Sequence, residues 1–263
     1  MKKKSQKWFT SDFHFDHQKV IEYCCRPFAT THDMNEQLIA IWNATVADDD
    51  VIFFLGDFTV KSHKSREFVR QLKGRKVLIP GNHDGCFNFK PKAPRDIGCV
   101  RATRERHEKM CKIYLEDGWE SIHQELELKL KDGNTVLLTH LPYAPDIKSD
   151  DDIRYLEYRP EQKFKKDNQG IPISKQFHLH GHSHGRYIKY RNQIDVGIDG
   201  CLELYSEDQI IRMIRDNEYF IPGFLHKWYQ DQDEIKRLEK ERAEMEGDGY
   251  ALSESGLYLN IKG

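Results

Sequence analysis

The sequence predicts an α/β fold, a mixed-sheet β-sandwich flanked by helices, and two observations carry this prediction. Short apolar runs recur along the chain, and each ends in a polar cluster, as buried strands bounded by turn residues do. The runs with their polar ends are KWFTSDFH (7–14), VIFFLGD (51–57), KVLIPGNHD (76–84), TVLLTH (135–140), FHLHGHSH (177–184) and QIDVGID (193–199). Helical patterns separate several of these runs, and this alternation is typical of α/β domains with parallel strand pairs.

The helical patterns have recognisable starts and stops. A helix is predicted from Asp33, because Asp33 and Glu36 fit a capping box ahead of an apolar stripe at helical spacing. The stripe consists of Met34, Leu38, Ile41, Trp42 and Val46. A shorter helix around Phe68 is expected to stop at Gly74, and a helix around Tyr114 near Gly118. A last helix is predicted after Ser206, a residue type that caps helix N-termini.

Residues 126–140, LELKLKDGNTVLLTH, differ from the other segments. Leucines alternate with charged residues and then meet an Asp132-Gly133 turn, which predicts an antiparallel hairpin and hence a mixed sheet. We assign residues 1–216 to one domain. Residues 217–263 are predicted to be a C-terminal helical extension, packed on the domain or exposed to solvent, because residues 228–247 are charged and helix-prone.

Composition narrows the function classes. The chain has 263 residues, of which 38% are hydrophobic and 32% charged, so one domain with a sizeable core is expected. The net charge of −2 does not favour nucleic acid as a partner, without excluding it. We expect no membrane partner, because no apolar run approaches the roughly 18 residues of a membrane span. The start MKKKSQKWFTSD lacks the apolar core of a signal peptide, and the six cysteines show no CxxC spacing, so we expect reduced thiols and a cytoplasmic protein.

The stretch FHLHGHSHG places four histidines on alternate positions, His178, His180, His182 and His184. A strand rises about 3.3 Å per residue, so the four span roughly 20 Å and cannot share one metal. Glycines bracket the last two, where the strand is expected to end, and His182 and His184 are therefore the candidate ligands. His178 and His180 are expected to pack or orient the strand. The alternative is that all four are ordinary polar residues of a half-exposed strand.

Seven residues of metal-binding type stand at the ends of predicted strands, where ligands collect in open α/β sheets. They are Asp12, His14, Asp57, Asn82, His140, His182 and His184. Each one alone has an ordinary explanation, such as a helix cap or a turn, but one surface would gather all seven. Seven ligands suit two metal ions, and a carboxylate can bridge them. Carboxylate and imidazole together suit Mn, Fe or Zn; we expect two divalent ions, Mn first, with Fe, Zn or Ni as alternatives.

Five of these blocks, in this order, resemble the calcineurin-like metallophosphoesterases. The pattern D-x-H, GD, GNHD, H, GHSH stands here as Asp12-Phe13-His14, Gly56-Asp57, Gly81-Asn82-His83-Asp84, His140 and Gly181-His182-Ser183-His184. The segments RPF (26–28), MNEQLIAIWN (34–43) and NQIDVGID (192–199) further resemble small bacterial and phage-encoded members. The resemblance implies a four-layer αββα arrangement and a metal-dependent phosphoric ester hydrolase, either a phosphodiesterase or a phosphomonoesterase.

The resemblance also implies roles for the residues. Asp12, His14 and His184 look like ligands of one metal, and Asn82, His140 and His182 like ligands of the other, with Asp57 as the bridge. A hydroxide held between the metals would attack phosphorus in line. His83 looks like the catalytic general acid, or like a donor to the phosphoryl group.

One segment departs from the protein-phosphatase branch of the family. That branch has an Asp and an Arg soon after the bridging Asp, whereas GDFTVKS here has Val60 and no Arg. The departure argues against a protein-phosphatase role and removes the usual carboxylate partner of His83.

The expected substrate is a phosphoester of a small molecule or a nucleotide. Arg26 is a candidate substrate-binding residue, since a guanidinium can hold two phosphoryl oxygens; its alternative is a surface salt bridge. Residues 142–176 are long for a connection and could cover the site. Two alternatives remain open: a metal-dependent nuclease with the same site, and a non-catalytic interaction module on the same fold.

Overall fold

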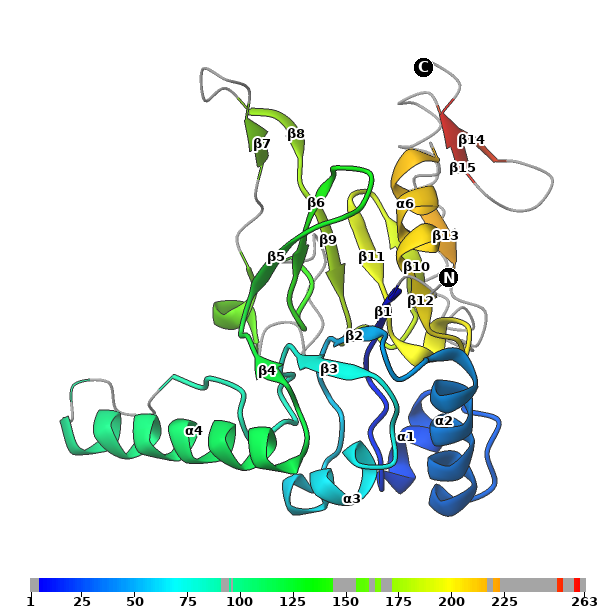
Figure 1. The fold of residues 1–263 in the computed structure, drawn as a ribbon. Helices are drawn as coiled ribbons and strands as arrows, with labels where there is room; N and C mark the ends of the chain where they lie inside the picture. Colours follow the sequence, from blue (N-terminus) through cyan, green and yellow to red (C-terminus); the bar gives the residue numbers. More distant parts are fainter. Residues whose placement is uncertain are drawn as a thin grey trace.

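The computed structural model describes residues 5–90, 95, 97–143, 155–160, 164–166, 172–216, 220–222, 250–252 and 258–260. Two larger β-sheets form its centre, and helices lie beside them (Figure 1). None of the helices in these ranges combines the length and the apolar character that a bilayer crossing needs. All six cysteines are free thiols, as the sequence predicts.

The first sheet has five strands in the order β12-β1-β2-β3-β4. The strands are β1 (Lys7–Thr10), β2 (Val51–Phe54), β3 (Arg75–Leu78), β4 (Ser121–Ile122) and β12 (Tyr205–Ser206). β1 to β4 run parallel, and β12 pairs antiparallel with β1. The carboxyl ends of β1, β2 and β3 therefore open on one edge of this sheet.

The second sheet has six strands in the order β13-β10-β11-β9-β6-β5. The strands are β5 (Leu126–Lys129), β6 (Thr135–Leu138), β9 (Phe177–His180), β10 (Tyr187–Tyr190), β11 (Gln193–Asp195) and β13 (Phe220–Pro222). β6, β9 and β11 run parallel, whereas β5 and β10 pair antiparallel with their neighbours. The predicted hairpin is β5–β6, and both sheets are mixed, which confirms the predicted fold class.

The helices and short helical turns are α1 (Gln18–Tyr23), α2 (Thr31–Thr45), η1 (Ser62–Lys64), α3 (Ser65–Val69), α4 (Ile97–Asp117), η2 (Leu156–Tyr158), η3 (Ile198–Gly200) and α6 (Glu207–Arg215). Ser206 caps α6 in a full capping box with Gln209, as predicted in part by its residue type. The predicted start of α2 is wrong: Thr30 is the N-cap, and its side chain accepts the N–H of Asp33. Asp33 lies inside the first turn, where its charge favours the helix dipole.

Alternation along the strands divides the interior into two cores. In β2, Ile52 and Phe54 face a core shared with α2 and α3, whereas Phe53 faces a core between the two sheets. The inter-sheet core also contains Leu138 from β6 and Leu179 from β9. The first sheet is thus buried on both faces, as parallel sheets usually are. This packing fixes the register of its strands and so the position of the residues that follow them.

The C-terminal part differs from the prediction. Strand β13 pairs with β10, so the second sheet continues past the boundary expected at residue 216. Two further strands, β14 (Tyr250–Leu252) and β15 (Tyr258–Asn260), pair antiparallel where a helical extension was expected. The helix predicted for residues 228–247 lies outside the described residues. Strands β7 (Phe164–Lys166) and β8 (Pro172–Lys175) form a separate hairpin.

Candidate metal centre

All seven predicted ligand residues come together at the carboxyl ends of parallel strands. They are Asp12 and His14 after β1, Asp57 after β2, Asn82 after β3, His140 after β6, and His182 and His184 after β9. The two sheet edges are joined where Ser11 forms a parallel bridge with Gly197 and accepts the N–H of Ile198. One surface therefore receives side chains from both sheets.

The chain turns sharply at most of these positions. Positive φ angles, which non-glycine residues rarely adopt, occur at Asp12 (60°), His14 (50°), Asp57 (58°), His182 (68°) and His184 (49°). Each such residue costs about 1–3 kcal/mol, and such residues persist only where their surroundings hold them. Their concentration at five ligand positions marks these turns as a functional site.

Hydrogen bonds hold the turns in place. The Asp12 carboxylate accepts the backbone N–H of His182 at 3.0 Å, which ties the turn after β1 to the turn after β9. The buried Asp84 carboxylate accepts backbone N–H groups of Asp57 and Gly81, each at 2.8 Å, and so ties the turns after β2 and β3. The site is thus built from turns that are bonded to one another.

Two glycines of the sequence motifs are required by close approach. A Cβ at Gly81 would overlap the carboxylate of Asp57, and a Cβ at Gly181 would overlap the side chains of Ser11 and Asp12. Any side chain at either position would displace a ligand residue. This explains the glycines that precede Asn82 and His182 in the sequence.

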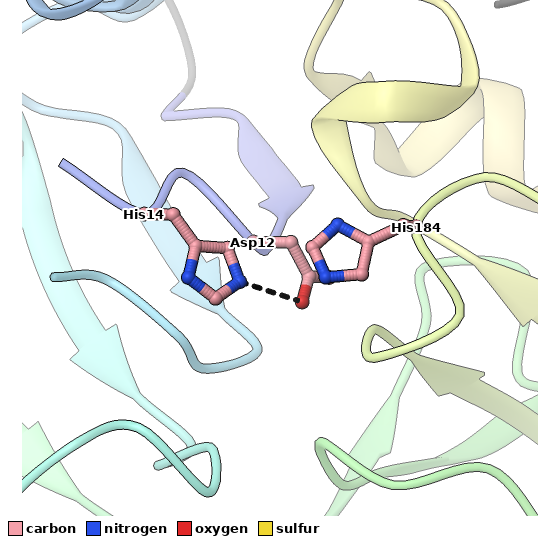
Figure 2. A group of neighbouring side chains, drawn as sticks. All are labelled: Asp12, His14 and His184. Atoms are coloured by element: carbon pink, nitrogen blue, oxygen red, sulfur yellow. Dashed lines mark ion pairs between the residues drawn. The ribbon is translucent and has the colours of Figure 1, made fainter. Parts of the chain in front are cut away.

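Asp12, His14 and His184 form the first ligand group. Their ligand atoms all lie within 4.8 Å of one another. Figure 2 shows the Asp12 carboxylate between the two imidazoles, with His14 Nε2 at 3.9 Å from Asp12 Oδ1. The two rings lie 5.0 Å apart between centroids.

Asp57, His140 and His182 form the second ligand group, again with ligand atoms within 4.8 Å of one another. Asn82 joins this group, because its Oδ1 lies 3.1 Å from His140 Nε2. His140 Nδ1 lies 2.6 Å from the carbonyl oxygen of Leu55, a contact that requires Nδ1 to carry the proton. His140 Nε2, which faces the group, is then the nitrogen that can offer a lone pair to an ion.

Asp57 lies between the two groups. Its Oδ2 is 3.5 Å from His14 Nε2 of the first group and 3.4 Å from His140 Nε2 of the second. Asp57 is almost fully buried, and its Oδ1 accepts the backbone N–H of His83 at 2.8 Å. The carboxylate is therefore fixed where it can offer an oxygen to both groups.

The electrostatics match a cation site. Burial holds the pKa of His14 and of His182 well below the ordinary range, so both are neutral imidazoles at neutral pH. Burial would raise the pKa of Asp57, but His140 and His14 outweigh it and hold that pKa well below its usual value. These three groups are therefore in the protonation states that metal ions require. Burial would lower the pKa of His140 and of His184, but Asp57 raises that of His140 to about 9, and Cys24 and Asp199 raise that of His184 well above its usual value, so both would release a proton when an ion binds.

His14 gives the most direct indication of a missing partner. Both of its ring nitrogens are buried, and neither has a hydrogen-bond partner among the residues that the structure describes. A buried polar atom without a partner is costly and calls for an explanation, such as an ion. The donor set of carboxylates, imidazoles and one amide oxygen fits two divalent ions.

The other two predicted site residues, His83 and Arg26, differ in their exposure and contacts. His83 is exposed, and its ring lies 5.2 Å from that of His14, so it borders the first ligand group. Arg26 is 4% exposed, and each of its N–H groups has an acceptor: Asp199 receives two, and the rest go to main-chain oxygens and to Met34 Sδ. It has no donor left for a phosphate, which contradicts the predicted role in substrate binding. The alternative of a salt bridge is right in kind, because Arg26 pairs with Asp199, but the pair is buried and not on the surface.

The sequence reasoning missed residues that shape the site. Asp84 ends the run KVLIPGNHD and Asp199 ends QIDVGID, yet neither was predicted to have a role. A carboxylate at the end of a predicted strand is the feature that could have identified both. Cys24 was read only as a thiol, yet its Sγ lies 3.3 Å from His184 Nδ1. His17 also borders the site, with its ring 5.4 Å from that of His14.

The four histidines of the opening motif divide as expected. His178 and His180 lie in β9 and face away from the inter-sheet core, where His178 Nε2 contacts Thr139 Oγ1 at 2.8 Å. His180 Nε2 lies 3.2 Å from the hydroxyl of Tyr187. Part of the long connection, Tyr155, packs its ring edge-on against His182 at 5.6 Å, so this segment does reach the site.

Comparison with known proteins identifies the family of the chain. The family model of the calcineurin-like phosphoesterases matches residues 7–218, and the chain therefore belongs to that family. The family is one of metal-dependent phosphoesterases, and the resemblance drawn from the sequence motifs is confirmed.

Individual relatives carry no further functional information. The chain is 31% identical to the Gene 66 protein of Mycobacterium phage L5 over 224 residues, 80% of this chain and 94% of that protein. It is 45% identical over 80 residues to an uncharacterized protein of Methanocaldococcus jannaschii, a match that spans 29% of this chain and 46% of that relative. A crystal structure of a protein of unknown function from Aquifex aeolicus aligns with 80% of this chain and 99% of its own, with 19% identity and a TM-score of 0.50, which shows a shared fold.

Proposed function

We propose that the protein is a dinuclear metal-dependent phosphoesterase that hydrolyses a phosphoester of a small molecule or a nucleotide. The position of Asp57 between the two ligand groups is the observation that carries this proposal. Two metals about 3.5–4 Å apart need one carboxylate that reaches both, and that spacing is typical of phosphoester hydrolases.

The first group would hold one ion through Asp12, His14 and His184, and the second would hold the other through Asn82, His140 and His182. Such ions act as Lewis acids and lower the pKa of a bound water toward neutrality. Mn²⁺ is the first choice for this mixture of oxygen and imidazole ligands, with Fe, Zn²⁺ and Ni²⁺ as alternatives.

His83 is the general acid of the proposed reaction. The same strand-end turn that presents Asn82 to the second group places His83 beside the first, at the solvent-facing side of the site. From there its imidazole would donate a proton to the leaving oxygen of the substrate. The exposure of His83 also means that this side of the site is open to a ligand from solvent.

A substrate screen tests the proposal. Purified protein is stripped of metal, reloaded with Mn²⁺, Zn²⁺, Ni²⁺ or Mg²⁺, and assayed with nitrophenyl phosphate, bis-nitrophenyl phosphate, nucleotides, and single-stranded and duplex DNA. We expect hydrolysis of an activated ester with Mn²⁺, loss of activity with a chelator, and no activity in Asp57→Asn.

The arms of the screen separate the alternatives. Turnover of DNA well above turnover of nucleotides would replace the proposal with a nuclease. Absence of hydrolysis with every metal, in protein that binds two ions per chain, would indicate a non-catalytic module. Absence of bound metal altogether would remove both the proposal and the nuclease reading.

A further inference from the structure

Arg26 is a buried cation next to the first ligand group, and all of its guanidinium N–H groups donate hydrogen bonds. It follows α1, is 4% exposed, and bonds with no solvent-facing partner. Its Nε and Nη2 donate to the two carboxylate oxygens of Asp199 at 2.6 and 2.9 Å, a bidentate pair with fixed geometry. The two charges neutralise each other inside the protein. The pair can therefore affect the site mainly through the positions in which it holds neighbouring groups.

The other donors of Arg26 hold the turn that carries two ligands. Nη2 donates to the carbonyl oxygen of Asp12 at 2.5 Å, and Nη1 to that of Phe13 at 2.8 Å. Both carbonyls belong to the turn between Asp12 and His14, whose φ angles of 60° and 50° are left-handed. The guanidinium therefore stabilises the strained backbone from which both side chains project.

Asp199 extends the same connection to the third ligand. Its Oδ2 lies 2.7 Å from His184 Nδ1, which must carry a proton to donate to a carboxylate. The lone pair of His184 is then on Nε2, and Figure 2 shows this nitrogen beside the Asp12 carboxylate. Cys24 Sγ, at 3.3 Å from the same Nδ1, is a weaker second acceptor.

We propose that Arg26 and Asp199 are positioning residues of the first metal site. This inference rests on the proposed function, because it concerns how one of the two proposed ions is held. One buried ion pair would orient the three ligand residues of the first group. Asp199 fixes the tautomer and ring orientation of His184, and Arg26 fixes Asp199 together with the Asp12–His14 turn. Carboxylates that orient a ligating histidine typically change metal affinity about 10–100-fold when removed.

Two ligand residues of the second site, His140 and Asp57, are held without this pair. His140 is oriented by the carbonyl oxygen of Leu55 at 2.6 Å, a main-chain group of β2's carboxyl end. Asp57 is held by Asp84 through the backbone, not by Arg26. Loss of the Arg26–Asp199 pair should therefore weaken one ion and spare the other, which a general loss of stability would not do.

Asp199→Asn is the main variant, because it keeps the size of the side chain and removes the charge. We expect the dissociation constant for one Mn²⁺, measured by calorimetry, to rise about 10–100-fold. The dissociation constant for the second Mn²⁺ should change by less than about threefold. Arg26→Lys keeps a positive charge but loses the fork, and it should weaken the same ion.

Reference variants identify which ion is lost. The Co²⁺ absorption spectrum of Asp199→Asn at one equivalent should match that of His14→Ala and differ from that of His140→Ala. Glu207→Gln serves as the matched control: Glu207 is a buried carboxylate that pairs with Lys7 at 2.7 Å, between β1 and α6. It should lower stability without changing either dissociation constant.

A measurement on metal-free protein tests the inference independently of activity. Long-range ¹H–¹⁵N spectra should show His184 protonated at Nδ1 in the wild type. Protonation at Nε2 alone would overturn the inference, as would equal losses at both sites, or no loss, in Asp199→Asn. Wild-type protein that binds fewer than two ions would instead refute the proposed function, and the His184 spectrum would still decide the role of Asp199.

Discussion

His83→Ala should separate catalysis from metal binding. We expect kcat toward an ester with a poor leaving group to fall about 10²–10⁴-fold, as is typical when a general acid is removed. At about 1.4 kcal/mol per factor of ten, this corresponds to about 3–6 kcal/mol of lost transition-state stabilisation. For nitrophenyl esters, whose leaving group needs little protonation, the loss should be much smaller.

The structure limits what else this substitution can change. The contact between His83 and Asp57 is made by the backbone N–H at 2.8 Å, and alanine keeps it. The side chain is exposed, and substitutions of exposed side chains usually change stability by less than about 0.5 kcal/mol. Bound metal and melting temperature should therefore stay at wild-type values.

The assay measures kcat, metal content and melting temperature on one preparation, with phenyl and nitrophenyl phosphoesters side by side. His32→Ala is the matched control, because His32 is an exposed histidine at the start of α2 and its side chain pairs with the exposed Glu36. Wild-type kcat toward the phenyl ester in His83→Ala would refute the catalytic role. Loss of metal together with activity would show that His83 only braces the turn.

Three further outcomes are expected. Asp57→Asn should lower metal content more than His140→Ala, since Asp57 contacts both ligand groups; equal metal content in Asp57→Asn and wild type would remove the bridging assignment. His182→Ala and His184→Ala should each reduce bound metal, whereas His178→Ala should not; metal loss in a folded His178→Ala would contradict the geometry at the end of β9. The metal-free protein should lose stability at alkaline pH: burial would lower the pKa of His140, but Asp57 raises it to about 9. Because the folded pKa exceeds the unfolded value near 6.5, this contribution of about 3 kcal/mol is complete below pH 6.5 and disappears as pH rises through 9. Urea unfolding at pH 6.5 and 9.5, compared with His140→Ala, measures it, and identical pH dependence in both proteins would refute the charged Asp57–His140 pair.

The sequence predicted the strand ends and the candidate ligands because both are local features. Each ligand residue follows an apolar run within a few positions, and the chemistry of its side chain is visible without neighbours. The start of α2 was predicted wrongly at Asp33, because Asp33 is a good capping residue and so is Thr30, three positions earlier. The contact of Thr30 Oγ1 with the Asp33 N–H, which decided between them, depends on the path of the preceding loop.

Arg26 shows why the rest of the site was not predictable. An arginine that follows a predicted site loop favours phosphate binding or a surface ion pair, because arginine is seldom buried without a partner. Its partner, Asp199, is 173 residues away in the sequence and becomes a neighbour only after both sheets have assembled. The pairing that makes burial of Arg26 tolerable is thus a property of the fold, and no local pattern carries it.

The same reasoning applies to the left-handed turns. Histidine adopts a positive φ more often than most residues, but each such turn is unfavourable by itself, and no local pattern around His14 or His184 predicts it. The turns are held by bonds between motifs: Asp84 joins the turns after β2 and β3, Asp12 receives the His182 N–H, and Arg26 holds the carbonyls before His14. These bonds are all made between groups of the protein, so the protein itself sets much of the ligand geometry. A site organised in this way can impose spacing on two ions and orient a phosphoryl group between them, which is the preorganisation that phosphoester hydrolysis requires.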